Sequence, residues 1–184
     1  MVCLPGALAV LGVVSSLHAS EVEQLDVEHH DGIYKITMTF SVAAPLSPVR
    51  AMLTDYAHLS ALNSAIVESE VLPPTDQNAT RVRTRTKDCI LFLCADITRV
   101  EDVTSDGAGG FRATIVPGLS DMKSGLARWR FQSKKQVTRI RFEARMEPDF
   151  WIPPLIGPLL IKHRLRTHLE ETADNLERLA APGH

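Results

Sequence analysis

The chain has 184 residues, of which 45% are hydrophobic and 23% charged, and its formal net charge is −2. This length favours a single domain, and the apolar fraction is sufficient for a packed core. Proteins that bind nucleic acid usually carry a clear excess of basic residues. We therefore expect no nucleic-acid partner.

Residues 1–19 have the pattern of a secretory signal peptide. Residues 4–14 are almost wholly apolar, no acidic or basic residue precedes Glu21, and small residues surround a cleavage point expected after Ala19. The apolar run is too short for a good transmembrane helix. We expect residues 20–184 to form one domain that is periplasmic or secreted. The alternative is a buried N-terminal segment of a cytosolic protein.

The first part of the expected domain contains a strand and two short helices. Residues 21–30 are polar and are expected to lead into the fold. Residues 33–42 alternate between polar and apolar side chains, which is typical of a half-buried strand. A short helix around residues 48–53, a second around residues 56–62 and a strand over residues 66–72 are expected next.

The middle of the chain is a series of alternating segments joined by short turns. Such a run favours an antiparallel sheet, and with helices at its ends an α+β fold. One face carries apolar residues, while arginines alternate with them on the other. The ladder within residues 80–88 is typical of a solvated face, although a surface that docks an acidic partner is the alternative. The expected strands are residues 80–88, 95–103, 111–116, 125–132 and 137–146, and the ladder is Arg81, Arg83, Arg85 and Lys87.

Cys89 and Cys94 are an even pair that would remain after removal of the signal peptide. On one straight strand, residues five apart point to opposite faces and cannot bond. A hairpin through residues 90–93 would bring them together, so we expect a disulfide. Two unpaired, buried cysteines are the alternative.

The last fifth of the chain predicts one long amphipathic helix. It is expected to begin at Pro153-Pro154, because proline suits a first helical turn. An apolar stripe follows at spacings of three and four, so the helix of about 25 residues needs a partner surface about 38 Å long. The sheet is the expected partner, with Leu165 to Leu179 packed on it and Ile156 to Ile161 facing a ligand space.

Three segments in this order resemble the START-like (SRPBCC) helix-grip superfamily, and within it the polyketide cyclase and coenzyme Q-binding group. They are residues 49–59 with Asp55-Tyr56, the strand 125–131 with Trp129 and Phe131, and residues 140–158 leading into the final helix. The resemblance covers roughly residues 31–180. It implies a curved antiparallel sheet wrapped around the long C-terminal helix, with the two short helices after the first strand. Relatives of this kind bind lipids, quinones, sterols or polyketides in a deep apolar cavity.

The resemblance and the apolar strand faces together predict the residues that line the cavity. We expect binding or transport of a hydrophobic small molecule in the bacterial envelope, with no cofactor, metal site or catalytic residue. The alternative is a cyclase, aromatase or dehydratase that uses a cavity histidine or aspartate, for which Asp121 and Asp149 are candidates. The predicted lining residues are Phe40, Tyr56, Val82, Trp129, Phe131, Ile140, Phe142, Phe150, Trp151, Ile156 and Leu159.

Two apolar stretches have a further interpretation. Residues 90–93 and 150–152 suit core packing or a cap over the cavity. They also suit a gate or a rim that contacts a membrane surface, because tryptophan favours an interface between apolar and wet surroundings. Of the histidines, His168 flanks the apolar stripe and His58 lies in the short-helix segment, while no pair has the spacing of metal ligands.

Overall fold

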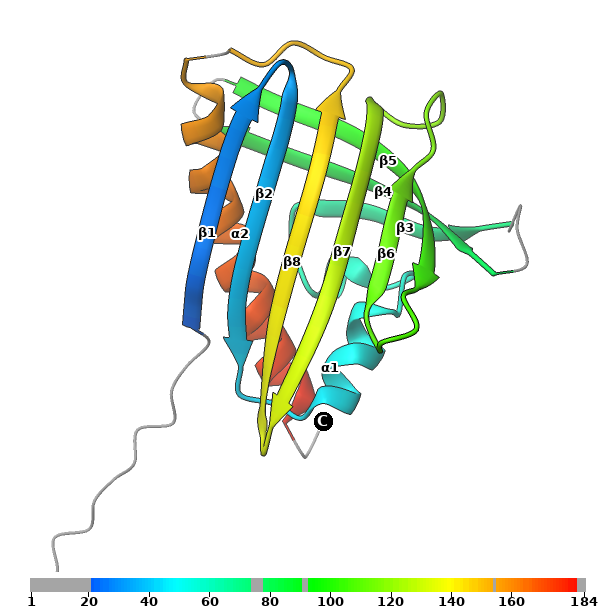
Figure 1. Ribbon diagram of the computed structural model, residues 1–184, viewed down its shortest axis with the longest axis vertical. Helices are drawn as coiled ribbons and strands as arrows, with labels where there is room; N and C mark the ends of the chain where they lie inside the picture. Colours follow the sequence, from blue (N-terminus) through cyan, green and yellow to red (C-terminus); the bar gives the residue numbers. More distant parts are fainter. Residues whose placement is uncertain (1–20, 74–77, 91–92, 154, 182–184) are drawn as a thin grey trace, which may run out of the picture.

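The computed structural model describes residues 21–73, 78–90, 93–153 and 155–181, in which eight strands and three helical segments are found. Figure 1 shows a curved sheet with the long helix α2 lying against it. In chain order the elements are β1 (Glu21–His30), β2 (Ile33–Val42), α1 (Leu46–Leu53), the short 3-10 helix η1 (Leu59–Ala61), β3 (Ile66–Leu72), β4 (Thr80–Ile90), β5 (Leu93–Ser105), β6 (Phe111–Ile115), β7 (Met122–Lys134), β8 (Val137–Pro148) and α2 (Gly157–Ala180).

All eight strands belong to one antiparallel sheet in the order β1-β2-β8-β7-β6-β5-β4-β3. The hairpin of β1 and β2, which precedes the helical insert, therefore lies at one end of the sheet, and β3, which follows the insert, is the edge strand at the other end. Helix α2 packs mainly against β1 and β2, at one side of the concave face. The helix-grip α+β fold expected from the sequence is confirmed.

Strand β1 corrects the expectation that residues 21–30 only lead into the fold. It pairs with the whole of β2, and Leu25 is buried while Val22 and Val27 are half-buried. A register shift between Val22 and Gln24 interrupts the alternation, as a β-bulge does. The period-two signal was therefore hidden, and the segment looked merely polar.

Helix α2 begins later than expected. Its first residue is Gly157, and Pro158 rather than Pro153 occupies the first turn. The backbone N–H of Gly157 donates to the carbonyl oxygen of Pro153 at 2.7 Å, so Pro153 lies just outside the helix. Pro158 fits the first turn because its missing N–H needs no partner there.

The core lies between β2, β8 and the C-terminal half of α2. Phe40, Ile140 and Leu176 are almost completely buried in it. Thr138 is the polar side chain at its margin, and its hydroxyl donates to the carbonyl oxygen of Ala44 at 2.7 Å. This contact satisfies a buried hydroxyl and fixes the chain where β2 leads into α1.

Two sequence predictions fall outside the described residues. The signal peptide of residues 1–19 is one, and the centre of the apolar hairpin tip, residues 91–92, is the other. Within the described ranges, no helix has the length and hydropathy needed to cross a membrane.

Candidate ligand-binding cavity

A cavity of about 340 Å³ lies between the inner face of the sheet, the segment from α1 to β3, and helix α2. This volume is at the small end of the usual range for ligand sites, ~300–1,000 Å³. Its lining is largely apolar. The apolar residues of the lining include Ile36, Met38, Leu53, Leu59, Leu62, Ala65, Ile66, Val103, Phe111, Ala113, Ala127, Met146, Leu165 and Leu169.

Six of the predicted lining residues border this cavity. They come from β2, β4, β7, β8 and the segment after α1. Strands that are distant in the chain therefore line the cavity together. Trp129 and Phe142 lie directly opposite each other in the register of β7 and β8, with ring centroids 4.4 Å apart. The six are Phe40, Tyr56, Val82, Trp129, Phe131 and Phe142.

The other five predicted lining residues lie outside the cavity lining. Ile140 shares the inward face of β8, but it lies where the core closes over the sheet and is fully buried. Phe150 and Trp151 lie in the exposed loop between β8 and α2, and Ile156 and Leu159 are exposed at the start of α2. Because α2 begins at Gly157, these residues are placed at its free end rather than over the sheet.

The apolar stripe of α2 divides at a different point from the sequence expectation. Leu165, Leu169 and the neighbouring Thr172 line the cavity, although this half was expected only to pack the sheet. Further along, Ala173 and Leu176 are buried in the core. The middle of the helix, not its beginning, therefore forms the roof of the cavity.

One end of the cavity carries polar side chains that were not predicted from the sequence. Thr84 on β4 lies directly opposite Arg99 on β5, and Val82 lies opposite Glu101. Directly opposed residues share a face of the sheet, so Arg99 and Glu101 face inward with Thr84. The sequence of β5 contained this information, because Arg99, Glu101 and Val103 are spaced two residues apart and so share one face of the strand.

Thr84 is the most confined of these polar groups. Only 4% of the residue is exposed, and its Oγ1 has no hydrogen-bond partner within the described structure. Tyr56 lies near Glu101, and burial, followed by the charge of Glu101, raises the pKa of its phenol. This end of the cavity therefore offers a neutral phenol and an unsatisfied hydroxyl beside a guanidinium and a carboxylate.

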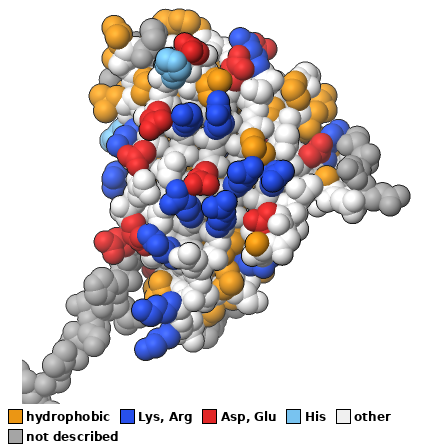
Figure 2. All heavy atoms as spheres, viewed as in Figure 1, with side chains coloured by type: hydrophobic (Ala, Val, Ile, Leu, Met, Phe, Trp, Pro, Cys, Tyr) orange, Lys and Arg blue, Asp and Glu red, His pale blue; other side chains and the backbone are white. Residues whose placement is uncertain are grey.

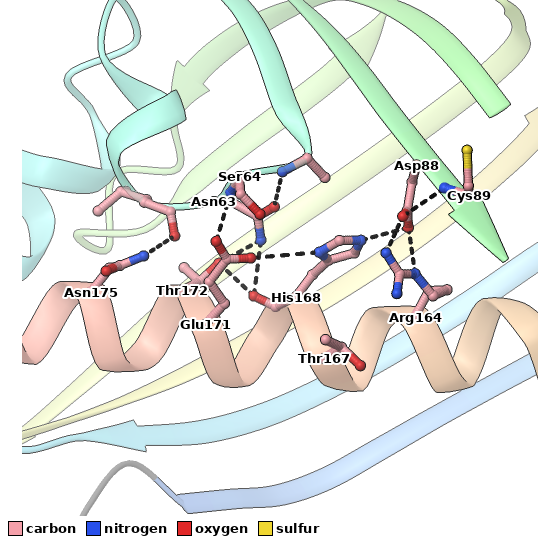
Figure 3. Close-up of polar contacts among 12 residues, drawn as sticks. Asn63, Ser64, Asp88, Cys89, Arg164, Thr167, His168, Glu171, Thr172 and Asn175 are labelled. Atoms are coloured by element: carbon pink, nitrogen blue, oxygen red, sulfur yellow. Dashed lines mark hydrogen bonds and ion pairs between the residues drawn. The ribbon is translucent and has the colours of Figure 1, made fainter. Parts of the chain in front are cut away.

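His168 on α2 lines the cavity and is held by Asp88 near the end of β4. Its Nε2 lies 2.7 Å from Asp88 Oδ2, and Arg164 Nε donates to the same oxygen at 2.7 Å. Figure 3 shows both side chains of α2 pointing toward Asp88. Burial alone would raise the pKa of Asp88, but the hydrogen bonds from Arg164 and His168 outweigh it and hold this pKa below its ordinary value.

The remaining polar contacts along this side of α2 are structural. The Asn63 amide donates to the carbonyl oxygen of His168 at 2.9 Å, and Glu171 Oε1 accepts from the backbone N–H of Ser64 at 2.8 Å. The Asn175 amide donates to the carbonyl oxygen of Leu62 at 3.1 Å. Helix α2 is therefore joined to the segment before β3 by polar contacts, and to β1 and β2 mainly by apolar packing.

The other candidate acids and bases lie away from the cavity. His58 is exposed and contacts Asp55, and Asp121 Oδ2 accepts from the backbone N–H of Thr98 at 2.7 Å. Asp149 is exposed and 4.0 Å from Lys123. The described residues contain no group of three or more histidine, cysteine, aspartate or glutamate side chains suited to a metal ion.

The predicted basic ladder of β4 is fully occupied by carboxylates. Arg81 forms two hydrogen bonds of 2.7 Å with Asp102 on β5. The other three members have equivalent cross-strand partners on β3 or β5. These pairs are Arg83 with Glu70, Arg85 with Glu68 and Asp96, and Lys87 with Asp96.

Cys89 and Cys94 are directly opposite each other in the β4–β5 register, and their sulfur atoms lie at bonding distance. Strands β4 and β5 pair antiparallel here, as the hairpin argument required. Cys89 also adjoins Asp88, so the pair lies beside the contact that joins β4 to α2.

Comparisons with known proteins are consistent with this geometry. Residues 34–181 match the family described as "Polyketide cyclase / dehydrase and lipid transport". No curated protein sequence matches the chain.

Several solved structures share the fold. A START superfamily protein from Mycobacterium smegmatis has a TM-score of 0.61 at 15% identity, covering 79% of this chain and 96% of that one. The lipid transfer and protein localization domain of human StarD13 has a TM-score of 0.59 at 12% identity, covering 91% and 87%. The Zhui aromatase/cyclase from Streptomyces sp. R1128 has a TM-score of 0.55 at 13% identity, covering 80% and 91%.

Proposed function

The chain belongs to the family of polyketide cyclases, dehydrases and lipid-transport proteins, and from that premise we propose that it binds and carries a small amphipathic molecule in the cavity under α2. It is a START/polyketide cyclase-type ligand-binding domain, and domains of this type bind hydrophobic ligands. Candidate ligands are a lipid, a quinone, a sterol or a polyketide-like compound.

The observation that carries the proposal is the largely apolar lining of the cavity between sheet and helix. The rings of Trp129, Phe131 and Phe142 face the space from one wall, and Leu165 and Leu169 face it from α2. Removal of apolar surface from water stabilises a complex by ~25 cal/mol/Å². Burial of about 300 Å² of ligand would contribute roughly 7 kcal/mol before the cost of association.

The polar end of the cavity supports a ligand with one oxygen-bearing group. Arg99 offers donors, and the buried hydroxyl of Thr84 has no hydrogen-bond partner among the described residues. A buried polar group without a hydrogen bond is unfavourable by roughly 1–3 kcal/mol, so a ligand carbonyl or hydroxyl placed here relieves that cost. The small volume favours a single-chain or few-ring molecule over a two-chain lipid.

Native mass spectrometry tests the proposal directly. Delipidated protein is mixed with a ubiquinone analogue, a fatty acid and a polycyclic probe, and the protein purified from its own host is analysed beside it. Uptake of at least one class at one molecule per chain is expected. Failure to take up any probe, with the folded state verified, would contradict the proposal.

A cavity-filling variant provides the matched control. Ala127 lines the cavity on β7, and Ala127→Leu places a larger side chain in that space. The variant is expected to lose ligand while remaining folded. Undiminished uptake would indicate that ligand binds elsewhere on the protein.

His168 supports an enzyme as the second candidate. Asp88 holds Nε2, while the buried Nδ1 lacks a hydrogen bond within the described structure and lies 3.8 Å from Glu171 Oε2. A histidine oriented in this way can transfer protons in a cyclisation or dehydration. His168→Gln should then abolish conversion of a polyketide-like substrate without abolishing its binding. Equal product formation by both proteins would remove this candidate.

We propose the bacterial envelope as the location and a membrane as a surface that the protein contacts. The signal-like residues 1–19 and the facing positions of Cys89 and Cys94 support an oxidising compartment. N-terminal sequencing of protein from fractionated cells tests the location, with a mature chain starting at Ser20 as the expected result. Full-length chain in the cytosol would contradict it.

A further inference from the structure

Six arginines project from the outer face of β6, β7 and β8, on the side of the sheet opposite the cavity. They are here called the outer arginine cluster. Figure 2 shows basic side chains gathered near the centre of this face of the molecule. The cluster consists of Arg112, Arg128, Arg130, Arg139, Arg141 and Arg145.

The strand register places like charges directly opposite one another in this cluster. Arg112 lies opposite Arg128, and Arg130 lies opposite Arg141. Directly opposed like charges destabilise a sheet. Glu143 is the carboxylate among them, 2.7 Å from Arg141 and 4.0 Å from Arg130.

Charge compensation on this face is therefore incomplete. Glu23 at the sheet edge pairs with Arg139. Arg128 lies directly opposite Glu143, so this one carboxylate is shared among Arg128, Arg130 and Arg141. For Arg112 and Arg145, no ion pair is found within the described ranges. The basic ladder of β4 differs, since each of its four cations contacts a carboxylate. The same protein thus neutralises one basic surface and leaves another with a local positive excess, despite an overall charge of −2.

An exposed apolar segment continues from the Arg145 end of β8. In it, Trp151 is 78% exposed, Leu155 95% and Leu159 70%, and Phe150 and Ile156 are also exposed. Side chains of this size are unfavourable in water when they lie close together. Nearby, Glu147 and Asp149 are both within 4.0 Å of Lys123, which offsets part of their charge.

We propose that this combined surface docks on an anionic lipid bilayer. Guanidinium groups bind lipid phosphates through paired hydrogen bonds, and each basic residue near an anionic membrane strengthens binding. Trp151, Leu155 and Leu159 supply the apolar contact with the interface. An acidic protein could satisfy the arginines but would not require the exposed apolar segment beside them, so a bilayer fits both observations.

The proposal deepens the proposed function and rests on its membrane contact. Bilayer docking would hold the protein where an amphipathic ligand is concentrated. The cavity lies on the opposite face of the sheet, so the outer arginine cluster remains free to bind lipid whether or not the cavity is occupied.

Vesicle cosedimentation tests the proposal. Vesicles of equal parts phosphatidylcholine and phosphatidylglycerol are compared with pure phosphatidylcholine, at about 50 mM and about 500 mM salt, where electrostatic attraction is long-ranged and screened respectively. The protein is expected to bind the anionic vesicles at low salt and to be largely released at high salt. Equal binding to both vesicles, or none to either, would overturn the proposal.

Matched variants locate the surface. Replacement of Arg128, Arg130 and Arg141 by glutamine is expected to weaken binding to the anionic vesicles by roughly 100-fold. The control replaces Arg83 on β4 and the exposed Arg166 and Arg178 on α2 by glutamine, which changes the charge equally at sites off the cluster. Equal weakening in both triple variants would overturn the assignment to this face. Thermal unfolding monitored by circular dichroism verifies that each variant is folded.

Tryptophan fluorescence tests the apolar part. The chain has two tryptophans, so Trp129→Phe leaves Trp151 as the single reporter. Quenching of Trp151 by brominated phospholipid in anionic vesicles is expected. Absence of quenching while the protein is vesicle-bound would exclude insertion of this segment and overturn the combined surface.

Ligand uptake by the cluster variant separates this proposal from the proposed function. Retained uptake together with lost vesicle binding supports both. If the wild-type protein binds vesicles but takes up no ligand, only the ligand-binding function would be contradicted. Wild-type protein that takes up ligand but ignores anionic vesicles would overturn the docking proposal alone.

Discussion

Asp88 on β4 and His168 on α2 join the sheet to the helix at the margin of the cavity, with Asp88 Oδ2 2.7 Å from His168 Nε2. Arg164 donates to the same carboxylate from one turn earlier in α2. The helix is otherwise attached to the sheet through β1 and β2. Asp88 is therefore the central acceptor on the side of α2 that faces β4.

Replacement of this carboxylate should destabilise the protein. Asp88→Asn removes the charge that Arg164 and His168 contact, and hydrogen bonds to charged groups contribute about 1.5–3 kcal/mol each. Because Asp88 is partly exposed, we expect a loss of about 1–3 kcal/mol in the free energy of unfolding near pH 7. Urea unfolding measures it. Asp149→Asn, at an exposed loop position, is the control and should change little.

The same contact predicts how stability depends on pH. The folded-state pKa of Asp88 lies below its unfolded value of ~3.9, so its contribution is fully present above that value and is lost as pH falls through the folded pKa. The difference between wild type and Asp88→Asn should therefore shrink as the pH falls below about 4. A difference that persists undiminished at the lowest pH would contradict this account.

The unsatisfied hydroxyls of Thr84 and Thr39 allow a paired test of the polar end. Both are buried without a hydrogen-bond partner in the described structure, but only Thr84 lines the cavity. Thr84→Val and Thr39→Val should each leave the free energy of unfolding of the ligand-free protein unchanged or raise it by up to about 1–2 kcal/mol.

Ligand affinity should separate the two threonine variants. Thr84→Val is expected to weaken binding of a quinone or fatty-acid probe by roughly tenfold, the equivalent of one hydrogen bond, while Thr39→Val leaves it unchanged. Isothermal titration with the probe identified by mass spectrometry measures both. Equal affinities in the two variants would show that the ligand makes no hydrogen bond to Thr84.

Ile140 and Phe142 are adjacent inward residues of β8 with different expected roles. Ile140→Ala should lower the free energy of unfolding by about 2–5 kcal/mol, since it empties a packed core site. Its folded fraction should bind ligand normally. Phe142→Ala enlarges the cavity itself, so ligand affinity should fall by roughly tenfold or more, because a large buried apolar contact is lost. Ligand titration of the folded variants checks the distinction, and equal affinities would contradict it.

The facing cysteines predict a bond in the mature protein. Cys89 and Cys94 are five residues apart, so the closed loop is short and a disulfide would stabilise the fold by about 2 kcal/mol. Protein from an oxidising compartment should show both thiols blocked until a reductant is added. Thiol labelling with peptide mass spectrometry tests this, and the Cys89→Ala/Cys94→Ala variant should lose a similar stability. Two labelled cysteines in unreduced protein would contradict the prediction.

Much of the fold was determined by local pattern. Alternation over residues 33–42 and 137–146 specified which side chains face inward, because successive residues of a strand point to opposite faces. The long amphipathic stripe after Pro158 specified a helix that must cover a sheet. The bulge in β1 defeated the same reasoning, since one extra residue reverses the apparent pattern.

The position of the cavity was decided only by tertiary structure. Ile140 and Phe142 lie on the same face of β8 and are both strongly hydrophobic, yet Ile140 is fully buried in the core and Phe142 borders the cavity. Phe150, Trp151, Ile156 and Leu159 were predicted to line the cavity from their apolar character, but the late start of α2 places them in the exposed segment.

The polar chemistry of the site likewise depends on the assembled fold. Asp88 is distant in the chain from Arg164 and His168, which lie one turn apart on α2, and the three meet only when α2 crosses the end of β4. By itself, the sequence determined the fold class, the inward faces and the cysteine hairpin, because these follow from contacts between near neighbours and from strand periodicity. The tertiary structure decided which inward residues enclose a cavity and which charges remain unpaired, because those depend on distances between elements that no local pattern encodes.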